Sequence, residues 1–136
     1  MKSLTLFIAT ILSVFVLDMI WLGLIAKNIY AENIGFLLRK SGDAMTPIWW
    51  AAALVYVCIA IGIVYFVVPR AQGDYVIAVS AGIVLGLVTY GIYDFTNYSL
   101  LANWPWKITC IDFIWGMFLC GSSSLFVTWI QNRFFS

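Results

Sequence analysis

The chain contains no histidine, and only 10% of its 136 residues are charged. The missing histidine removes the commonest general base near neutral pH and the commonest transition-metal ligand. A soluble domain carries about 25% charged and about 45–50% apolar residues, whereas 64% of this chain is hydrophobic. The chain therefore lacks the polar side chains needed to cover a surface in water, and a lipid-facing exterior is the simplest interpretation.

Cysteine and positive charge are also scarce. The three cysteines, Cys58, Cys110 and Cys120, are odd in number and scattered, and each lies inside an apolar run. Neither a disulfide framework nor a zinc site can be built from them, so we interpret them as small core residues. The formal net charge is +1 and no basic cluster exists, which excludes a nucleic-acid-binding face. We expect no cofactor.

Four apolar runs are long enough to cross about 30 Å of hydrocarbon at about 1.5 Å per residue. They are predicted at Leu4–Ala26, Pro47–Val68, Tyr75–Asn97 and Ile108–Ile130, with Pro47 in the first turn of its helix. A short polar turn at residues 69–74 makes the second and third spans antiparallel neighbours. The sequence therefore predicts a single all-α domain over residues 1–136, an integral membrane four-helix bundle.

The first connection, residues 27–43, is longer than the others. It carries Tyr30, Ile34 and Leu37 at helical spacing, with charged residues around them. This pattern predicts an amphipathic helix that lies in the membrane interface, or a continuation of the first span that ends at Ser41–Asp43. Either arrangement could form a lid over the bundle.

The sequence predicts the orientation of the chain in the membrane less clearly than it predicts the four spans. Asp18 and Trp21 interrupt the first apolar run, so we expect a retained span rather than a cleaved signal peptide. Four spans place both termini and residues 69–74 on one side of the membrane, called side A, and residues 27–43 on the other, called side B. Lys and Arg are almost equally divided, and those next to the span ends on side A favour cytoplasmic termini.

Three aspartates, Asp18, Asp94 and Asp112, lie within the predicted spans, all in the half of the membrane nearer side B. A carboxylate at the bilayer centre costs about 2.5–3.5 kcal/mol, and such residues commonly mark functional sites. A purely structural role is the alternative. Asp94 and Asp112 could lie close to the headgroups at lower cost, and Asp112 in the first turn of a helix would favour the helix dipole.

Two stripes at helical spacing indicate how the spans pack. The stripe on the third span is Gly82, Gly86, Tyr90, Asp94 and Asn97, and that on the fourth is Asp112, Gly116, Cys120 and Ser124. Small residues let two helices approach closely in lipid, so we expect these two spans to converge on a polar mouth near side B. Trp21 and Trp115 each lie three residues after an aspartate, where an indole N–H could donate to a carboxylate.

Clustered carboxylates repel each other when ionised, so one or more should hold a proton and form an acid–base pair. We expect Asp18 and Asp94 to be acid and base, with Asp112 as a third carboxylate. The expected substrate-binding residues are Trp21, Tyr90, Tyr93, Asn97 and Trp115. Since the mouth opens within a leaflet, a lipid-like apolar molecule is the natural ligand.

Other functions remain open. The carboxylates and Asn97 could bind a hard divalent cation through oxygen ligands. A non-enzymatic accessory protein would bind a membrane partner through the glycine stripe, and a homodimer is plausible because four spans enclose little volume. A proton-linked transporter is a further alternative, although nothing in the half near side A continues a polar path. The residues do not decide whether the protein is an enzyme.

The ordered motifs also resemble a known family. They are Asp18, Trp21, Leu22 and Gly23; Tyr90, Gly91, Tyr93, Asp94, Thr96 and Asn97; and Trp104, Pro105, Asp112, Trp115 and Gly116. Together they cover essentially the whole chain and resemble a family of small bacterial membrane proteins of unknown function. The resemblance implies a four-span protein of the bacterial inner membrane, without an assigned activity or catalytic residue.

Overall fold

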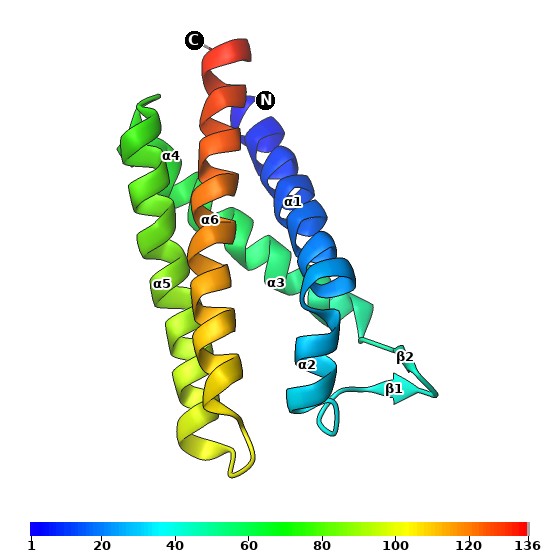
Figure 1. The fold of residues 1–136 in the computed structure, drawn as a ribbon. Coiled ribbons are helices and arrows are strands. Elements are labelled where there is room, and N and C mark those ends of the chain that lie inside the picture. The colour runs from blue at the N-terminus through cyan, green and yellow to red at the C-terminus, as the bar shows by residue number, and fades with distance from the viewer. Residues whose placement is uncertain (136) are drawn as a thin grey trace.

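The computed structural model describes residues 1–135 and is almost entirely helical. Its helices are α1 (Lys2–Ile20), α2 (Lys27–Ile34), α3 (Trp49–Gly62), α4 (Val68–Ala71), α5 (Tyr75–Leu100) and α6 (Trp106–Phe134), with π-helical segments η1 (Trp21–Ile25) and η2 (Ile63–Val67). Two short strands, β1 (Lys40–Ser41) and β2 (Ala44–Met45), form a hairpin in the first connection (Figure 1).

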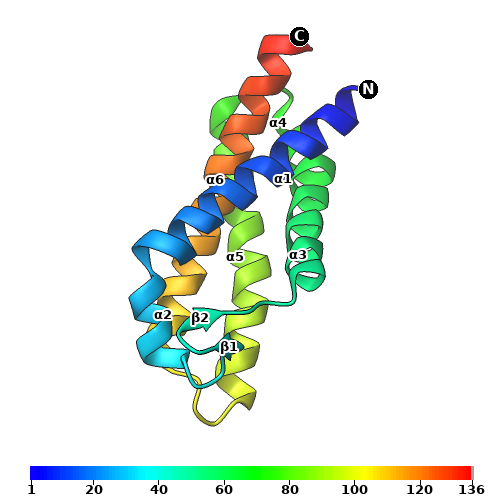
Figure 2. The same cartoon turned by 90° about the vertical axis from the view of Figure 1, so that its right-hand side faces the viewer.

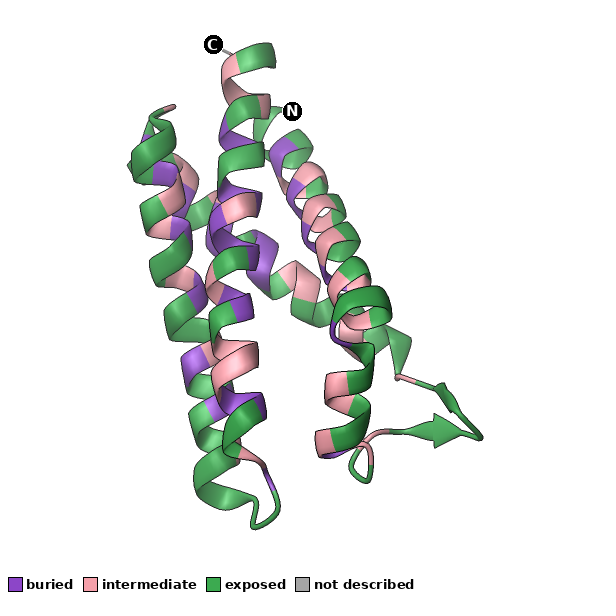
Figure 3. Ribbon diagram, viewed as in Figure 1, coloured by how far each residue is buried: buried purple, intermediate pink, exposed green. Residues whose placement is uncertain are grey.

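Four helical stretches are long and apolar enough to cross a membrane: Lys2–Ile25, Trp49–Ala71, Tyr75–Leu100 and Trp106–Phe134. The all-α, four-span prediction is confirmed, with small differences at the ends of the spans. Pro47 precedes its helix instead of occupying the first turn, because α3 begins at Trp49 after an extended Ile48. Buried residues lie mainly where the helices face one another, and exposed residues lie elsewhere along the ribbon (Figure 3). Many of the exposed residues are large and apolar, as expected of a lipid-facing surface.

Both termini lie at one end of the molecule, together with the turn between α4 and α5 (Figures 1 and 2). This end is side A. The α2 helix, the β1–β2 hairpin and the loop between α5 and α6 lie at the opposite end, side B. The α3 helix begins well short of the side-B ends of α5 and α6 in both views, so α2 covers α6 there instead.

The closest packing in the bundle joins α5 to α6 through the predicted glycine stripe. A Cβ atom on Gly86 would overlap the carbonyl group of Gly116 and lie 2.8 Å from Met117 Cα, and a Cβ on Gly82 would lie 2.6 Å from the Cys120 carbonyl oxygen. The two predicted stripes therefore face each other. Because α6 covers Gly82 and Gly86, this surface is not free to bind another membrane protein.

The other two spans pack on α6 through a compact apolar cluster. Val14 of α1, Ile59 and Ile63 of the second span, and Leu119 and Cys120 of α6 are buried together. Hydrogen bonds add to this contact in the half near side A, where the Ser13 hydroxyl donates to the Ser123 hydroxyl over 3.1 Å. Such bonds between membrane helices average only about 0.6 kcal/mol, so close packing carries most of the stability.

Two π-helical segments interrupt the spans, and sequence periodicity does not reveal either. In η2 the cause is Pro69, which lacks an N–H and whose ring would clash with the Tyr65 carbonyl in a regular helix. In η1 the backbone N–H of Ala26 donates to the Trp21 carbonyl over 2.7 Å, five residues back. Segments of this kind often lie at functional sites, and η1 directs α2 back towards α6.

The first connection differs from its prediction. The amphipathic helix α2 ends at Ile34, not at Ser41–Asp43, and the chain then forms the hairpin, whose turn uses Gly42 at φ +61°. On α2 the buried Ile34 packs against Trp104 and Ile108 at the start of α6. The predicted amphipathic segment is therefore a short helix that packs against the side-B end of α6.

Candidate functional site

Asp18 lies in the last turn of α1 and accepts two hydrogen bonds from aromatic side chains. The Tyr56 hydroxyl of α3 donates to its carboxylate over 2.9 Å, and the Trp115 indole N–H of α6 donates over 3.1 Å. The carboxylate is nearly buried, at 9% exposure. Asp18 thus joins three of the four spans, and its burial is balanced by two donors.

Asp112 has a donor from the connecting helix. The Tyr30 hydroxyl of α2 donates to the Asp112 carboxylate, and the Trp21 indole N–H makes a long hydrogen bond, 3.4 Å, to the Tyr30 oxygen. Burial, together with the negative charge of Asp112, raises the pKa of the Tyr30 phenol. The phenol therefore stays protonated at neutral pH and remains a donor to the carboxylate.

The two indoles connect these hydrogen-bonded groups. The rings of Trp21 and Trp115 stack with their centroids 4.5 Å apart and their planes only 5° from parallel. Each tryptophan was expected to donate to the aspartate on its own helix. Instead, Trp115 of α6 donates to Asp18 of α1, and Trp21 reaches Asp112 of α6 only through Tyr30. Each of these hydrogen bonds joins residues of two different helical elements, so together they hold the side-B half of the bundle together.

Asp94 differs from the other two aspartates. Its side chain is fully buried, and neither carboxyl oxygen accepts a hydrogen bond from a tyrosine, a tryptophan or a backbone N–H of the described residues. Asp94 and Asp112 interact electrostatically and lie within hydrogen-bonding reach of each other when one of them is protonated, and Asp112 also interacts with Asp18. The structure therefore gathers the three aspartates, but it leaves Asp94 without the donors that the others have.

Two structural explanations for these carboxylates do not fit the geometry. Asp112 is the seventh residue of α6, which begins at Trp106, so it lies beyond the first turn where the helix dipole acts. Asp94 lies six residues, or about 9 Å, before the end of α5 and has no exposed surface. The helix dipole therefore does not explain Asp112, and Asp94 has no exposed surface through which it could be solvated at a helix end.

The remaining predicted residues lie around this cluster at different depths. Tyr90 is half-buried, and its ring occupies the space where a Cβ atom on Gly116 would be. Tyr93 is 54% exposed and packs edge-on against Trp104, with ring centroids 6.1 Å apart. Asn97 is half-buried and interacts with Tyr93. Tyr90 thus borders the aspartates directly, whereas Tyr93 and Asn97 lie towards the surface.

Sequence reasoning did not assign Tyr30 and Tyr56 to the site. Tyr30 was recognised only as one of the residues at helical spacing in the first connection, and Tyr56 was not singled out. A usable signal did exist, because a tyrosine inside a span carries a hydroxyl that needs a partner in lipid. Their partners are Asp112 and Asp18, respectively.

The described residues hold no group of three or more His, Cys, Asp or Glu side chains arranged to bind a metal ion. Two of the three carboxylates already accept hydrogen bonds from tyrosine and tryptophan donors. A site for a hard cation would need six to eight oxygen ligands for calcium, or octahedral oxygen ligands for magnesium.

A family model described as "Predicted membrane protein (DUF2177)" matches residues 3–129 of the chain. The chain belongs to this family. The match covers nearly the whole chain, and it includes the three aspartates together with four helices able to span a membrane. The protein is thus a multi-pass membrane protein, and the family has no established function. No curated protein and no solved structure shows a significant match to the chain.

Proposed function

We propose that this protein binds, and acts on, a lipid-like apolar molecule in the half of the membrane near side B, with Asp94 and Asp112 as the reactive pair. The observation that carries the proposal is Asp94, a fully buried carboxyl that receives no hydrogen bond from an aromatic or backbone donor and interacts with a second carboxyl, Asp112. A buried polar group in this condition is costly, and in lipid it commonly marks a functional site.

The two carboxyls suit proton transfer. Asp94 and Asp112 interact within an apolar bundle, where two like charges so close together cannot both be ionised. One proton shared between two carboxyls makes one of them an acid and the other a base. Tyr30 donates to Asp112 and so stabilises the ionised form of that residue, which leaves the proton on Asp94.

This assignment changes the roles expected from the sequence. Asp18 was the expected partner of Asp94, but its carboxylate is held by Tyr56 and Trp115. We therefore give Asp18 a positioning role, because it fixes the indole of Trp115 that stacks on Trp21. Tyr90, Tyr93 and Asn97 stay in the proposal as groups that orient the ligand, with Tyr90 nearest to the carboxyls.

Access to the pair is proposed to depend on α2. The helix is attached to the bundle by the Tyr30–Asp112 hydrogen bond and by Ile34 against Trp104 and Ile108. Both contacts lie on one face of a helix of only eight residues, so a small movement of α2 would break them together. The same movement would release Asp112 from its donor and open the way to Asp94 from the leaflet.

The proposal also includes the membrane in which the protein lies and its orientation there. The family resemblance favours the bacterial inner membrane, with the termini and side A in the cytoplasm. The aspartates would then lie in the outer leaflet half of that membrane.

The test uses a bacterial strain from which the gene has been deleted. The wild-type gene or an Asp94→Asn variant is put back into this strain, and the complete lipid profiles of the two resulting strains are compared. We expect one lipid species to change with the wild type and to remain at the deletion level with Asp94→Asn, at equal protein amounts. Asp43→Asn is the matched control, because Asp43 is exposed in the hairpin turn. Identical profiles for wild type and Asp94→Asn would refute the proposal.

A proton-linked transporter is the second candidate, and one observation favours it. Two buried hydroxyl groups lie on α6 towards side A, twelve and sixteen residues after Asp112. Ser124 and Thr128 are buried there, and their hydroxyl oxygens have no partner. Uptake that depends on a pH gradient in proteoliposomes, without a change in lipid profile, would favour this candidate.

A further inference from the structure

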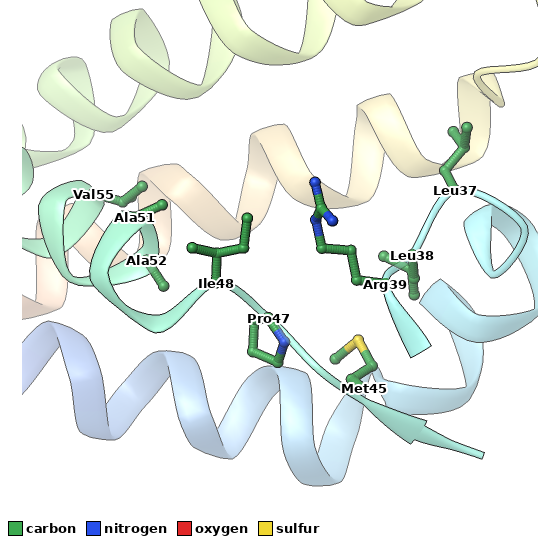
Figure 4. Close-up of a pocket in the computed structure, with 9 residues that line it drawn as sticks. All are labelled: Leu37, Leu38, Arg39, Met45, Pro47, Ile48, Ala51, Ala52 and Val55. Carbon is green, nitrogen blue, oxygen red and sulfur yellow. The ribbon is translucent and has the colours of Figure 1, made fainter. Parts of the chain in front are cut away.

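A second site candidate lies outside the aspartate cluster, where the first connection meets the start of α3. A groove of about 420 Å³ is lined there mainly by apolar side chains, among them Leu37, Leu38, Pro47, Ala52 and Val55, together with Arg39 (Figure 4). None of the three membrane aspartates lines this groove. It is therefore distinct from the proposed reactive pair.

Arg39 is the only charged residue that lines the groove. Figure 4 shows its side chain extending beside Ile48, among the apolar side chains of the wall. Within residues 1–135 its guanidinium has neither an ion pair nor a hydrogen bond. Its backbone is nonetheless fixed, because the Thr46 N–H donates to the Arg39 carbonyl over 2.9 Å at the base of the hairpin. A positioned, unpaired cation in an apolar groove is suited to an anionic ligand.

The place of the groove in the membrane narrows the class of ligand. Ala52 and Val55 belong to the second span, whereas Arg39 lies before it in the side-B connection. The exposed Trp49 and Trp50 lie in the chain between Arg39 and these span residues, and tryptophan side chains gather at the interface between membrane and water. The groove therefore runs from the headgroup level into the hydrocarbon, and its small alanine leaves room for an acyl chain.

We propose that this groove binds a phospholipid with a net negative headgroup, with its phosphate on Arg39 and one acyl chain along Ala52 and Val55. A guanidinium can bind two phosphate oxygens at once, which a lysine cannot do as well. A zwitterionic headgroup fits less well, because no acidic side chain lines the groove to pair with its ammonium group. This site does not depend on the reactivity of Asp94.

The test is native mass spectrometry of the purified protein with an equal mixture of phosphatidylglycerol and phosphatidylcholine that carry the same acyl chains. We expect the wild type to retain phosphatidylglycerol about fivefold more than phosphatidylcholine, the effect of one basic residue near a membrane surface. Arg39→Gln should bring the ratio close to one. Arg70→Gln, at the exposed side-A end of the same span, is the matched control and should keep the wild-type ratio.

Two further measurements separate the parts of the proposal. Ala52→Phe should fill the acyl-chain portion and reduce retention of both lipids, while circular dichroism reports an intact fold. Inorganic phosphate at the concentration of the lipid should not displace phosphatidylglycerol, because it lacks the chain. The proposal would be overturned if the wild type retained the two lipids equally, or if Arg39→Gln left the ratio of phosphatidylglycerol to phosphatidylcholine unchanged. It would also be overturned if Ala52→Phe retained both lipids as well as the wild type does, or if phosphate displaced phosphatidylglycerol.

Discussion

Replacing Asp18 with asparagine is expected to destabilise the folded protein by about 1–3 kcal/mol, the cost of leaving a buried donor unsatisfied. The carboxylate of Asp18 accepts from both Tyr56 and Trp115. An asparagine offers only one oxygen, and its amide N–H₂ would face the second donor. The measurement is the free energy of unfolding in detergent micelles, followed by tryptophan fluorescence.

The same substitution at Asp94 is the matched comparison, and it is expected to cause no measurable destabilisation. Asp94 accepts no hydrogen bond from an aromatic or backbone donor, and an asparagine N–H can donate to the Asp112 carboxylate as a protonated Asp94 would. Because the proton shared with Asp112 is placed on Asp94, the substitution exchanges one neutral buried group for another. If Asp94→Asn proves as destabilising as Asp18→Asn, Asp94 has a structural role and the functional interpretation loses its basis.

A methyl group added at Gly86 is expected to destabilise the protein by about 1–3 kcal/mol or more, since it overpacks a tight contact. The new Cβ atom would meet the carbonyl group of Gly116 and the backbone of Met117. Backbone atoms cannot rotate away as a side chain can, so α5 and α6 would have to separate. This steric cost exceeds the gain in helix propensity from glycine to alanine, which is at most about 1 kcal/mol.

Gly23→Ala is the control for Gly86→Ala, because a Cβ atom at Gly23 meets nothing within 4 Å. We expect this variant to be as stable as the wild type or slightly more stable. Thermal unfolding of the two variants in the same micelles makes the comparison. Equal stability of Gly86→Ala and Gly23→Ala would mean that the close packing of α5 on α6 is absent in the protein.

The sequence predicts the spans and the contact between α5 and α6 well, for a physical reason. Hydrophobic length decides whether a helix crosses a membrane, and glycines four residues apart decide which face can approach a neighbour. Both are properties of a single segment. The close approach of Gly82 and Gly86 to α6 could therefore be predicted before the structure was known.

The partners of the aspartates could not be predicted in the same way. Whether Trp115 donates to Asp112 on its own helix or to Asp18 on another depends on how α1 is rotated and shifted against α6. No local pattern fixes that register. The π-helical segment η1 changes the direction of the chain after Trp21, which is why Tyr30 returns to α6.

The structure separates two roles that look alike in sequence. Asp18 and Asp112 are joined to aromatic donors from other elements, so their charges help to hold the helices in place. Asp94 is fully buried and is joined to no aromatic donor. We therefore infer that folding explains two of the three aspartates and that a ligand explains the third.

Labelling with a lipid-soluble carbodiimide tests this central claim most directly, because such reagents add to protonated carboxyls that they reach from the bilayer. Peptide mass spectrometry of the labelled protein identifies the modified residue. The account predicts modification of Asp94, with Asp18 and Asp112 protected by their hydrogen-bond donors. The account would be contradicted if Asp18 or Asp112 were modified in preference to Asp94, or if none of the three aspartates were modified.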